Sequence, residues 1–194
     1  MDYFERIWAA VPEGAEPENF ALRRDYLLAN VASGDRVLDI GCGEGAFTAA
    51  LADAGARPVG VEVATEPLRR ARARHPELEL HLLDGQLPFA PGSFDVVWAG
   101  ELLEHLRDPQ ALLDDVRRVL AGTGRLLLST PDHPRLLRLR LALSRPAFDA
   151  HFDPRSDHLR FFTANTLALV LDDAGFDRPR IERRRQTLLA CAPR

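Results

Sequence analysis

The chain of 194 residues contains no lysine, so all 25 of its basic side chains are arginines. Cysteine is also scarce. The two cysteines, Cys42 and Cys191, are too few for a disulfide framework and too few for a metal site built on thiolates. The sequence therefore predicts a protein without disulfide bonds and without a bound metal ion.

Long apolar runs and an excess of basic charge are absent as well. No run approaches the roughly 18 residues that a membrane-spanning helix needs, and residues 1–10 lack the apolar core of a signal peptide. The net charge of −4 gives no general attraction for nucleic acid. We therefore expect a cytoplasmic protein that binds no nucleic acid. We interpret the arginine, alanine and leucine usage as GC-rich coding bias, which favours a bacterial source.

The composition, with 46% hydrophobic and 28% charged residues, predicts a single globular domain over residues 1–194. Short apolar runs alternate with helical patterns, which is typical of βαβ units in a parallel sheet. The runs are apolar throughout, as strands buried on both faces are. The predicted strands are Arg36–Ile40, Pro58–Val63, Leu78–Leu83, Phe94–Ala99 and Gly124–Thr130.

Two later runs, Arg180–Arg185 and Thr187–Ala192, predict a terminal hairpin. The expected fold is therefore α/β: a three-layer Rossmann-like sandwich with a mostly parallel seven-stranded sheet and a C-terminal antiparallel hairpin. Residues 1–33 precede the first strand and are expected to form a helical cap, with a helix at Phe20–Val31. Residues 131–162 interrupt the alternation, and we interpret them as an insertion that could act as a substrate lid.

Glycine and proline mark the ends of the predicted helices. Asp108 followed by Pro109 predicts an N-cap and a first helical position, and Gly122 is expected just after the end of that helix. The predicted helices are Glu44–Ala54, Thr65–Arg74, one that begins at Asp108 and one that begins at Thr163.

The most informative stretch is Val37–Gly45, which reads V-L-D-I-G-C-G-E-G. A glycine turn between a strand and a helix lets backbone approach a ligand closely, because glycine has no Cβ. Glu62 ends the next apolar run, where an acidic side chain can reach a ribose. These features predict a cofactor that contains adenosine.

Two kinds of cofactor fit this turn. The spacing Gly41-x-Gly43-x-x-Ala46 also fits the dinucleotide fingerprint of NAD enzymes. That fingerprint holds a pyrophosphate at the helix N-terminus. We expect Glu44 in the first helical turn to repel a pyrophosphate, and Asp39 adds a second negative charge. A cationic cofactor without phosphate suits these acids better, and an NAD-dependent oxidoreductase remains the alternative.

Five motifs in order resemble the class I S-adenosylmethionine-dependent methyltransferases, of the small-molecule group called type 11 or ubiquinone-biosynthesis-like. They are D-I-G-C-G-E-G at 39–45, G-V-E-V at 60–63, L-L-D-G-Q-L-P-F at 82–89, F-D-V-V-W-A-G-E-L-L-E-H-L at 94–106 and D-H-L-R-F-F-T at 157–163. The resemblance implies S-adenosylmethionine as cofactor and methyl transfer to a small-molecule or lipid-like acceptor. It favours O-methylation, and methylation of a nitrogen or carbon atom is the alternative. A binding module that retains the cofactor but performs no chemistry is a second alternative.

The resemblance also implies roles for the cofactor residues. Asp39 and the backbone of Gly41 would hold the methionine ammonium, Glu62 would accept both ribose hydroxyls, and Asp84 would accept from the adenine amino group. Cys42 belongs to the turn, and we interpret it as a packing residue rather than a nucleophile. The remaining cofactor contacts are assigned to Gly43, Gly45, Val63, Gly85, Gln86, Ala99 and Gly100.

Three residues are candidates for the chemistry of methyl transfer. Glu101 and His105 follow the fourth strand, where the methyl group would be delivered, and His133 follows the fifth strand. Histidine has the intrinsic pKa of a general base. The alternative is that Glu104 and His105 brace the neighbouring helix. His158, with Arg160, is expected to anchor the insertion, in which His151 also lies.

Leucines and arginines alternate over Arg135–Arg145. This stretch could form a lid over an apolar substrate, rest on a membrane surface or a partner, or pack as an amphipathic helix with its arginines in water. Tyr3, Phe4 and Trp8 could belong to the same lid or could be core aromatics.

Overall fold

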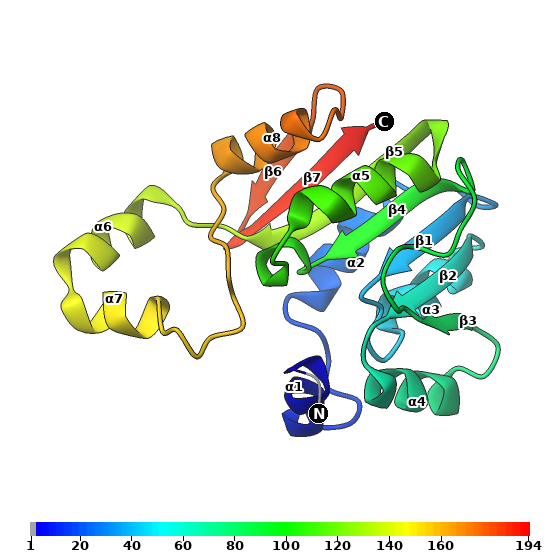
Figure 1. Cartoon of the computed structure of the whole chain (residues 1–194), viewed down its shortest axis with the longest axis horizontal. Coiled ribbons are helices and arrows are strands. Elements are labelled where there is room, and N and C mark those ends of the chain that lie inside the picture. The colour runs from blue at the N-terminus through cyan, green and yellow to red at the C-terminus, as the bar shows by residue number, and fades with distance from the viewer. Residues whose placement is uncertain (1–2) are drawn as a thin grey trace.

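The computed structural model describes residues 3–194, with the side chain of Tyr3 outside the described part. One sheet has the strand order β3-β2-β1-β4-β5-β7-β6 (Figure 1). The strands from β3 to β5 run parallel, and β7 pairs antiparallel with both β5 and β6. The predicted fold class is confirmed. The strands are β1 Arg36–Ile40, β2 Arg57–Glu62, β3 Glu79–Leu82, β4 Phe94–Gly100, β5 Leu120–Pro131, β6 Arg180–Arg184 and β7 Thr187–Pro193.

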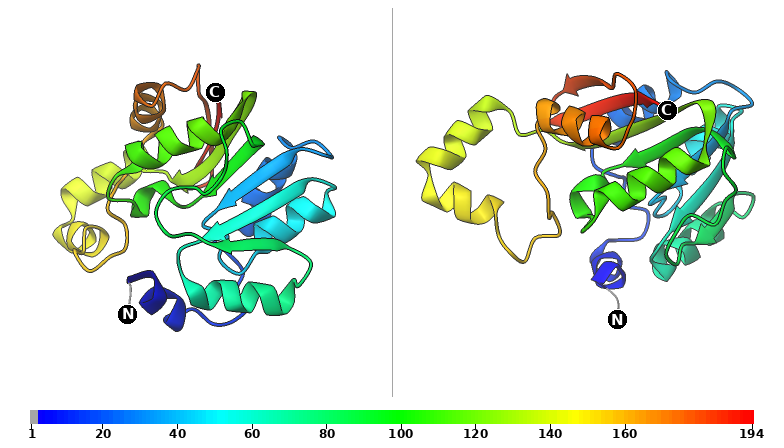
Figure 2. Two further views of the ribbon diagram at one scale, coloured as in Figure 1. Left: turned by 45° about the vertical axis from the view of Figure 1, so that its right-hand side comes forward. Right: turned by 45° about the horizontal axis from the view of Figure 1, so that its top comes forward.

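Helices cover both faces of this sheet. Phe20–Leu28 (α2) and Ala46–Asp53 (α3) pack on one face, where Trp98 and Phe47 meet with ring centroids 5.4 Å apart. The other face carries α5 (Pro109–Val119) and α8 (Ala164–Asp173), as the two views of Figure 2 show. The helix α4 (Thr65–Arg74) flanks β2 and β3. Both faces of the central strands are therefore buried, as their apolar runs predict.

The helix α5 ends earlier than expected from Gly122, which was predicted to stand just after its end. The helix stops at Val119, and Leu120 is already extended, with ψ of 141°, and pairs with Phe94. Asp108 does cap the helix, because its side chain accepts from the backbone N–H of Ala111 at 3.1 Å. Leu120 is buried in the core, so tertiary packing favours the strand conformation before the first glycine is reached.

The segment 1–33, expected to be a cap, divides into two parts. The helix α2 joins the layer over the sheet, where Tyr26 and Leu27 are buried. The helix α1 (Tyr3–Ala10) lies instead beside α4 at the edge of the molecule (Figure 1). Only α1 is therefore placed to cover the carboxyl ends of the strands.

The insertion 131–162 forms two short helices, α6 (Arg135–Leu143) and α7 (Arg145–His151), which project from the body as a hairpin (Figures 1 and 2). Leu136 and Leu143 are 81% and 78% exposed. Leu141 is 8% exposed, whereas Leu139 and the arginines of α6 face solvent. The helix therefore buries one leucine rather than the broad apolar face expected of an amphipathic helix packed on the domain. Within residues 3–194 no helix has the length and apolar character to span a bilayer.

Candidate functional site

A cavity of about 580 Å³ opens at the carboxyl ends of the central strands. Its walls include Gly41 after β1, Glu62 at the end of β2 and Glu101 after β4. In the sheet, β2 lies on one side of β1 and β4 lies on the other side. The cavity therefore lies at the point where the strand order reverses. This is the ligand-binding crevice of open α/β sheets.

The glycine turn needs left-handed backbone at three places. The φ angles of Gly41, Gly43 and Gly45 are 73°, 54° and 81°, which side chains with a Cβ rarely adopt. Gly41 and Cys42 donate their N–H groups to the Val61 carbonyl at 2.8 and 3.1 Å, which fixes the turn to β2. A Cβ on Gly43 would lie 2.9 Å from the Trp8 ring, so this glycine makes room for α1.

Glu62 links the turn to the next helix. Its Oε1 accepts the N–H groups of Val63 and Ala64 at 2.8 and 3.0 Å, and its Oε2 accepts that of Gly43 at 3.1 Å. Burial raises the pKa of this carboxyl, while the backbone N–H groups of Ala64, Gly43 and Val63 act in the opposite direction. A carboxylate has about four acceptor positions, so one position on Oε2 is left for a ligand in the cavity.

Asp39 lies behind the turn, next to the cavity residues Ile40 and Gly41. It is 2% exposed and accepts a hydrogen bond of 2.6 Å from the Thr48 hydroxyl. Burial raises its pKa to about 6, and the Thr48 hydrogen bond and the charge of Arg23 lower it in part. Because Asp39 is buried, its carboxylate does not reach the cavity directly. Its charge would act on a ligand through the glycine turn.

The turn after β3 contributes the third part of the predicted cofactor site. Gly85 and Gln86 line the cavity, and Asp84 stands next to Gly85 in sequence. Five of the twelve predicted cofactor residues line the cavity: Gly41, Glu62, Val63, Gly85 and Gln86. The other seven are not among its lining residues: Asp39, Cys42, Gly43, Gly45, Asp84, Ala99 and Gly100.

Two of these outer residues have packing roles. Cys42 is buried against Gly60, where an added Cβ would lie 3.0 Å from the Cys42 sulfur. Gly100 faces the buried Arg23, whose Nη2 would lie 2.5 Å from a Cβ at that position. Arg23 donates to the Ser129 hydroxyl at 3.0 Å and lies 3.9 Å from Glu101. Arg23 was missed by the sequence reasoning, since a single arginine on a helix carries no recognisable signal.

The position expected for Glu44 is wrong. The helix α3 begins at Ala46, so Glu44 lies outside the first turn. Its carboxylate pairs with Arg70 and Arg74, both at 3.1 Å, and accepts the Gly14 N–H at 2.8 Å. Because two arginines balance this charge, Glu44 gives no argument against a pyrophosphate.

The helix α1 forms the outer wall of the cavity with Phe4, Ile7 and Trp8. It is tied down at the N-terminus of α4, where Glu5 accepts hydrogen bonds of 2.5 Å from both the N–H and the hydroxyl of Thr65. Phe4 and Trp8 therefore take the covering position that was one of the two expectations for them. Ile7 carried no sequence signal.

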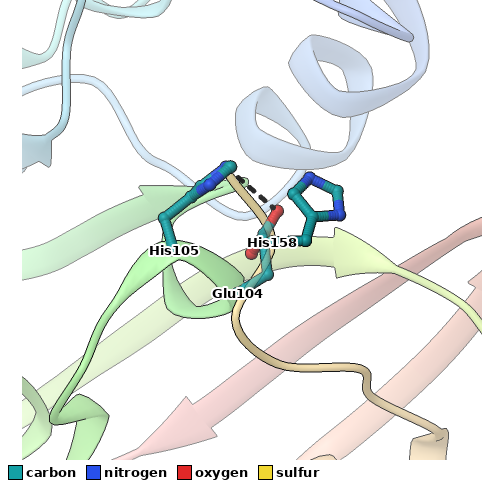
Figure 3. Close-up of side chains that lie close together, drawn as sticks. All are labelled: Glu104, His105 and His158. Atoms are coloured by element: carbon teal, nitrogen blue, oxygen red, sulfur yellow. Dashed lines mark ion pairs between the residues drawn. The ribbon is translucent and has the colours of Figure 1, made fainter. Parts of the chain in front are cut away.

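The segment after β4 brings acidic and imidazole groups to the cavity. Glu101 and His105 line it, and Glu104 and His158 lie next to His105 (Figure 3). The Nδ1–H of His105 donates to the Asp157 carbonyl at 3.0 Å, because a carbonyl can only accept. The lone pair of the neutral ring therefore lies on Nε2.

His133 is not among the residues that line this cavity. Its Nδ1 donates to the Phe162 carbonyl at 2.8 Å, and its Nε2 meets Nε2 of His151 at 3.1 Å. Both ring nitrogens are thus engaged in holding α7 near the end of β5. The geometry favours a tether over the catalytic role expected from sequence. Arg160 anchors the insertion as predicted, because it donates to the Leu106 carbonyl at 3.1 Å.

Comparisons with known proteins agree with this geometry. The profile of the family described as "Methyltransferase domain" matches residues 14–178. The chain is 32% identical over 165 residues to a demethylmenaquinone methyltransferase of Tropheryma whipplei, covering 77% of the chain and 69% of that protein. It is 32% identical over 157 residues to a ubiquinone biosynthesis O-methyltransferase of Xylella fastidiosa, covering 76% of the chain and 63% of that protein. The matched part thus spans about two thirds of these relatives.

Solved structures share the fold. A chain from the complex of the Haloferax volcanii Trm112 methyltransferase activator with a methyltransferase superposes with a TM-score of 0.77 at 22% identity, covering 100% of this chain and 98% of that one. An S-adenosylmethionine-dependent methyltransferase of Mesorhizobium loti gives a TM-score of 0.68 at 22% identity, covering 93% and 99%.

Proposed function

Since this chain belongs to the class I S-adenosylmethionine-dependent methyltransferases, we propose that it transfers a methyl group to a hydroxyl oxygen of a small-molecule or lipid-like acceptor. The observation that carries this proposal is the continuity of the cavity. One space connects the glycine turn and Glu62 with Glu101 and His105. A cofactor and an acceptor can therefore meet in it.

S-Adenosylmethionine would lie along the strand ends. The free acceptor position of Glu62 suits one ribose hydroxyl, and a second hydroxyl would have to displace the N–H of Gly43, which makes the longest of the three hydrogen bonds. Val63, Gly85 and Gln86 would surround the adenine. Asp39 would attract the methionine ammonium from behind Gly41, through water or the turn, rather than by direct contact.

The reaction requires that the sulfur, the methyl group and the acceptor oxygen are aligned, and it requires a proton acceptor. As the new O–C bond forms, the S–C bond breaks, and the sulfur keeps the electron pair and becomes a neutral thioether. The hydroxyl proton would pass to Nε2 of His105, which the Asp157 carbonyl keeps unprotonated in the neutral ring. The apolar side chains of α1 would exclude water from the reacting atoms.

The walls of the cavity are largely apolar. Leu102, Leu106 and Leu112 line it together with Ile7. Such walls suit an apolar ring or chain, and the two relatives are named for work on quinone-related compounds. An apolar acceptor with one reactive hydroxyl is therefore the substrate class that we propose. A nitrogen or carbon acceptor is the alternative.

We further propose that the α6–α7 hairpin rests on an anionic membrane surface, from which such an acceptor would come. Exposed leucines stand among Arg135, Arg138 and Arg140, a combination suited to anionic lipid. None of the residues 131–151 line the cavity, whereas Asp157 near the end of the insertion does. Replacing Leu136 and Leu143 with glutamate should reduce sedimentation with phosphatidylglycerol vesicles at least tenfold. Equal sedimentation of this variant would contradict the proposal.

Calorimetry tests the cofactor assignment directly. The chain should bind S-adenosylhomocysteine in the micromolar range and show no saturable heat with NADH. The reverse result would favour the oxidoreductase. If S-adenosylhomocysteine binds but labelled S-adenosylmethionine gives no labelled product with quinol or phenol acceptors, the chain would be a binding module.

Cofactor affinity should depend on pH through Asp39. Its folded-state pKa of about 6 exceeds the ordinary value of 3.8 because the carboxyl is buried. The folded protein therefore takes up a proton as pH falls through about 6, and Asp39 loses the charge that attracts the ammonium. Affinity for S-adenosylhomocysteine should drop about tenfold between pH 7 and pH 5.

The variant Asp39→Asn provides the control, because it should bind weakly with little change over the same pH range. A variant with the same pH dependence as the parent would assign the effect to another group. The effect of falling pH on the stability of the fold has the opposite sign to its effect on cofactor affinity. The contribution of Asp39 to folding rises as pH falls from above 6 toward 4, since the neutral form suits the buried position.

A further inference from the structure

We propose that Glu104, His105 and His158 bind one divalent transition-metal ion at the wall of the cavity. The three residues come from two distant segments, the turn Leu103–His105 and the end of the insertion. No sequence spacing links them, which explains why the sequence predicted no metal. The role of the ion described below rests on the proposed methyl transfer, whereas the site itself does not.

The geometry of the three side chains suits an ion. One ligand atom from each residue lies within 4.8 Å of the others (Figure 3). Ligands of a tetrahedral ion with bonds of about 2.1 Å stand roughly 3.4 Å apart. A movement of about 1 Å in side chains would therefore complete the site.

A second observation points to a missing ligand. Glu104 is 1% exposed, and its Oε2 accepts the hydroxyl of Thr130 at 3.0 Å. Its Oε1 is buried without a hydrogen-bond partner, and the nearest imidazole nitrogen, Nε2 of His105, lies 4.0 Å away. A buried carboxylate oxygen without a partner is unfavourable, and a cation between Glu104 and the two imidazoles would satisfy it.

The surrounding contacts hold the ligands in place. The Asp157 carbonyl fixes the tautomer of His105 so that Nε2 presents its lone pair, which is the usual second contact of a metal-binding histidine. The carbonyl of Glu104 accepts the N–H groups of Leu159 and Arg160 at 2.7 and 3.1 Å. These bonds join the two segments directly beside His158.

Glu101 faces the same region from the cavity side. Its φ is 52°, a left-handed backbone that is rare for glutamate, and its Oε1 is also buried without a hydrogen-bond partner. Three protein ligands leave the fourth position of a tetrahedral ion open to the cavity, where the Glu101 carboxylate can receive a proton. Two imidazoles with a carboxylate favour Mn²⁺, Fe²⁺ or Zn²⁺ over Ca²⁺.

An ion here would change how the acceptor loses its proton. A hydroxyl bound to the ion at the cavity wall has a lowered pKa and a fixed orientation. His105 would then serve as a ligand, and the hydroxyl proton would pass to the Glu101 carboxylate. The methyl group would still move from sulfur to oxygen, with the sulfur keeping the electron pair.

The rival explanation is that a proton occupies the site. Burial raises the pKa of Glu104 to about 8, and the charge of Glu101 acts in the same direction. A protonated Glu104 would need no ion. Direct metal binding separates the two explanations.

The test is titration of the chelator-treated full chain with MnCl₂, followed by calorimetry and by the loss of free Mn²⁺ signal in electron paramagnetic resonance. We expect one equivalent to bind, and Glu104→Gln and His158→Ala to weaken binding at least 30-fold. The control His81→Ala removes an exposed imidazole that pairs with Glu79 at 2.9 Å on β3, and it should bind Mn²⁺ as the parent does.

Titration with S-adenosylhomocysteine in the same samples separates this inference from the proposed function. Cofactor binding that persists in His158→Ala shows that the variant is folded. If the parent chain binds cofactor but neither Mn²⁺ nor Zn²⁺, or if the variants bind metal as well as the parent, the metal site is refuted and the methyl transfer stands. Absence of cofactor binding in the parent would refute the proposed function instead.

Discussion

Replacing Glu62 with glutamine is expected to weaken binding of S-adenosylhomocysteine by about 100-fold. Glutamine has the same shape, but its amide nitrogen replaces one carboxylate oxygen and cannot accept. The variant therefore loses either the N–H of Gly43 at Oε2 or those of Val63 and Ala64 at Oε1. Hydrogen bonds to a charged group contribute about 1.5–3 kcal/mol each, and about 2.7 kcal/mol corresponds to a hundredfold change in affinity. The loss affects both the ribose contact and the shape of the turn.

Calorimetry at constant pH measures this effect, and thermal unfolding without ligand shows how much of it is loss of structure. Glu79→Gln is the matched control, because that carboxylate is exposed on the neighbouring strand β3. It should leave affinity within twofold of the parent. Binding by Glu62→Gln within threefold of the parent would remove Glu62 from the cofactor site.

Truncating Trp98 to alanine is expected to lower the free energy of unfolding by about 3–5 kcal/mol, the usual cost of deleting a fully buried aromatic side chain. Trp98 is 1% exposed and lies in β4, between the sheet and α3. Its ring also lies 5.9 Å from the guanidinium carbon of the buried Arg23. The variant would therefore leave both a cavity and a less well held charge in the core.

Urea unfolding followed by circular dichroism measures this change without relying on tryptophan emission. Phe148→Ala is the control, since that side chain is 49% exposed on α7, outside the core, and its effect should stay below about 0.5 kcal/mol. A loss of less than 1 kcal/mol in Trp98→Ala would mean that the core around β4 repacks. The remaining tryptophan in that variant, Trp8, would then report on the cavity wall.

The central strands could be predicted closely because burial on both faces leaves a signature within each strand. The predicted run Arg36–Ile40 matches β1 in full, and Phe94–Ala99 misses β4 by one residue. The start of β5 could not be predicted, because Gly122 and Gly124 are typical of a helix end. In the fold, pairing with Phe94 and burial of Leu120 decide the conformation there.

The cofactor half of the site was accessible from sequence because its parts are local. Glu62 lies 19 residues from its partner Gly43, within one βαβ unit. In the other half, Glu101 and His105 were candidates from sequence, but the contacts that hold this half together were not accessible. Arg23 meets Ser129 across 106 residues, Glu5 meets Thr65 across 60, and His158 meets Glu104 through the insertion. Contacts between residues so far apart in sequence depend on the complete fold. A single sequence contains no periodic pattern that predicts them.

The pairing of β1 with β4 governs the order in which this molecule can assemble. Val37 lies beside Val96, so a loop of about 60 residues has to close before these strands meet, and such closures slow folding. The chain can form the β1–β2 unit early, with the glycine turn already shaped. The wall that carries Glu101 and His105 follows β4, so it depends on this distant pairing, whereas the glycine turn depends only on the neighbouring β1–β2 unit.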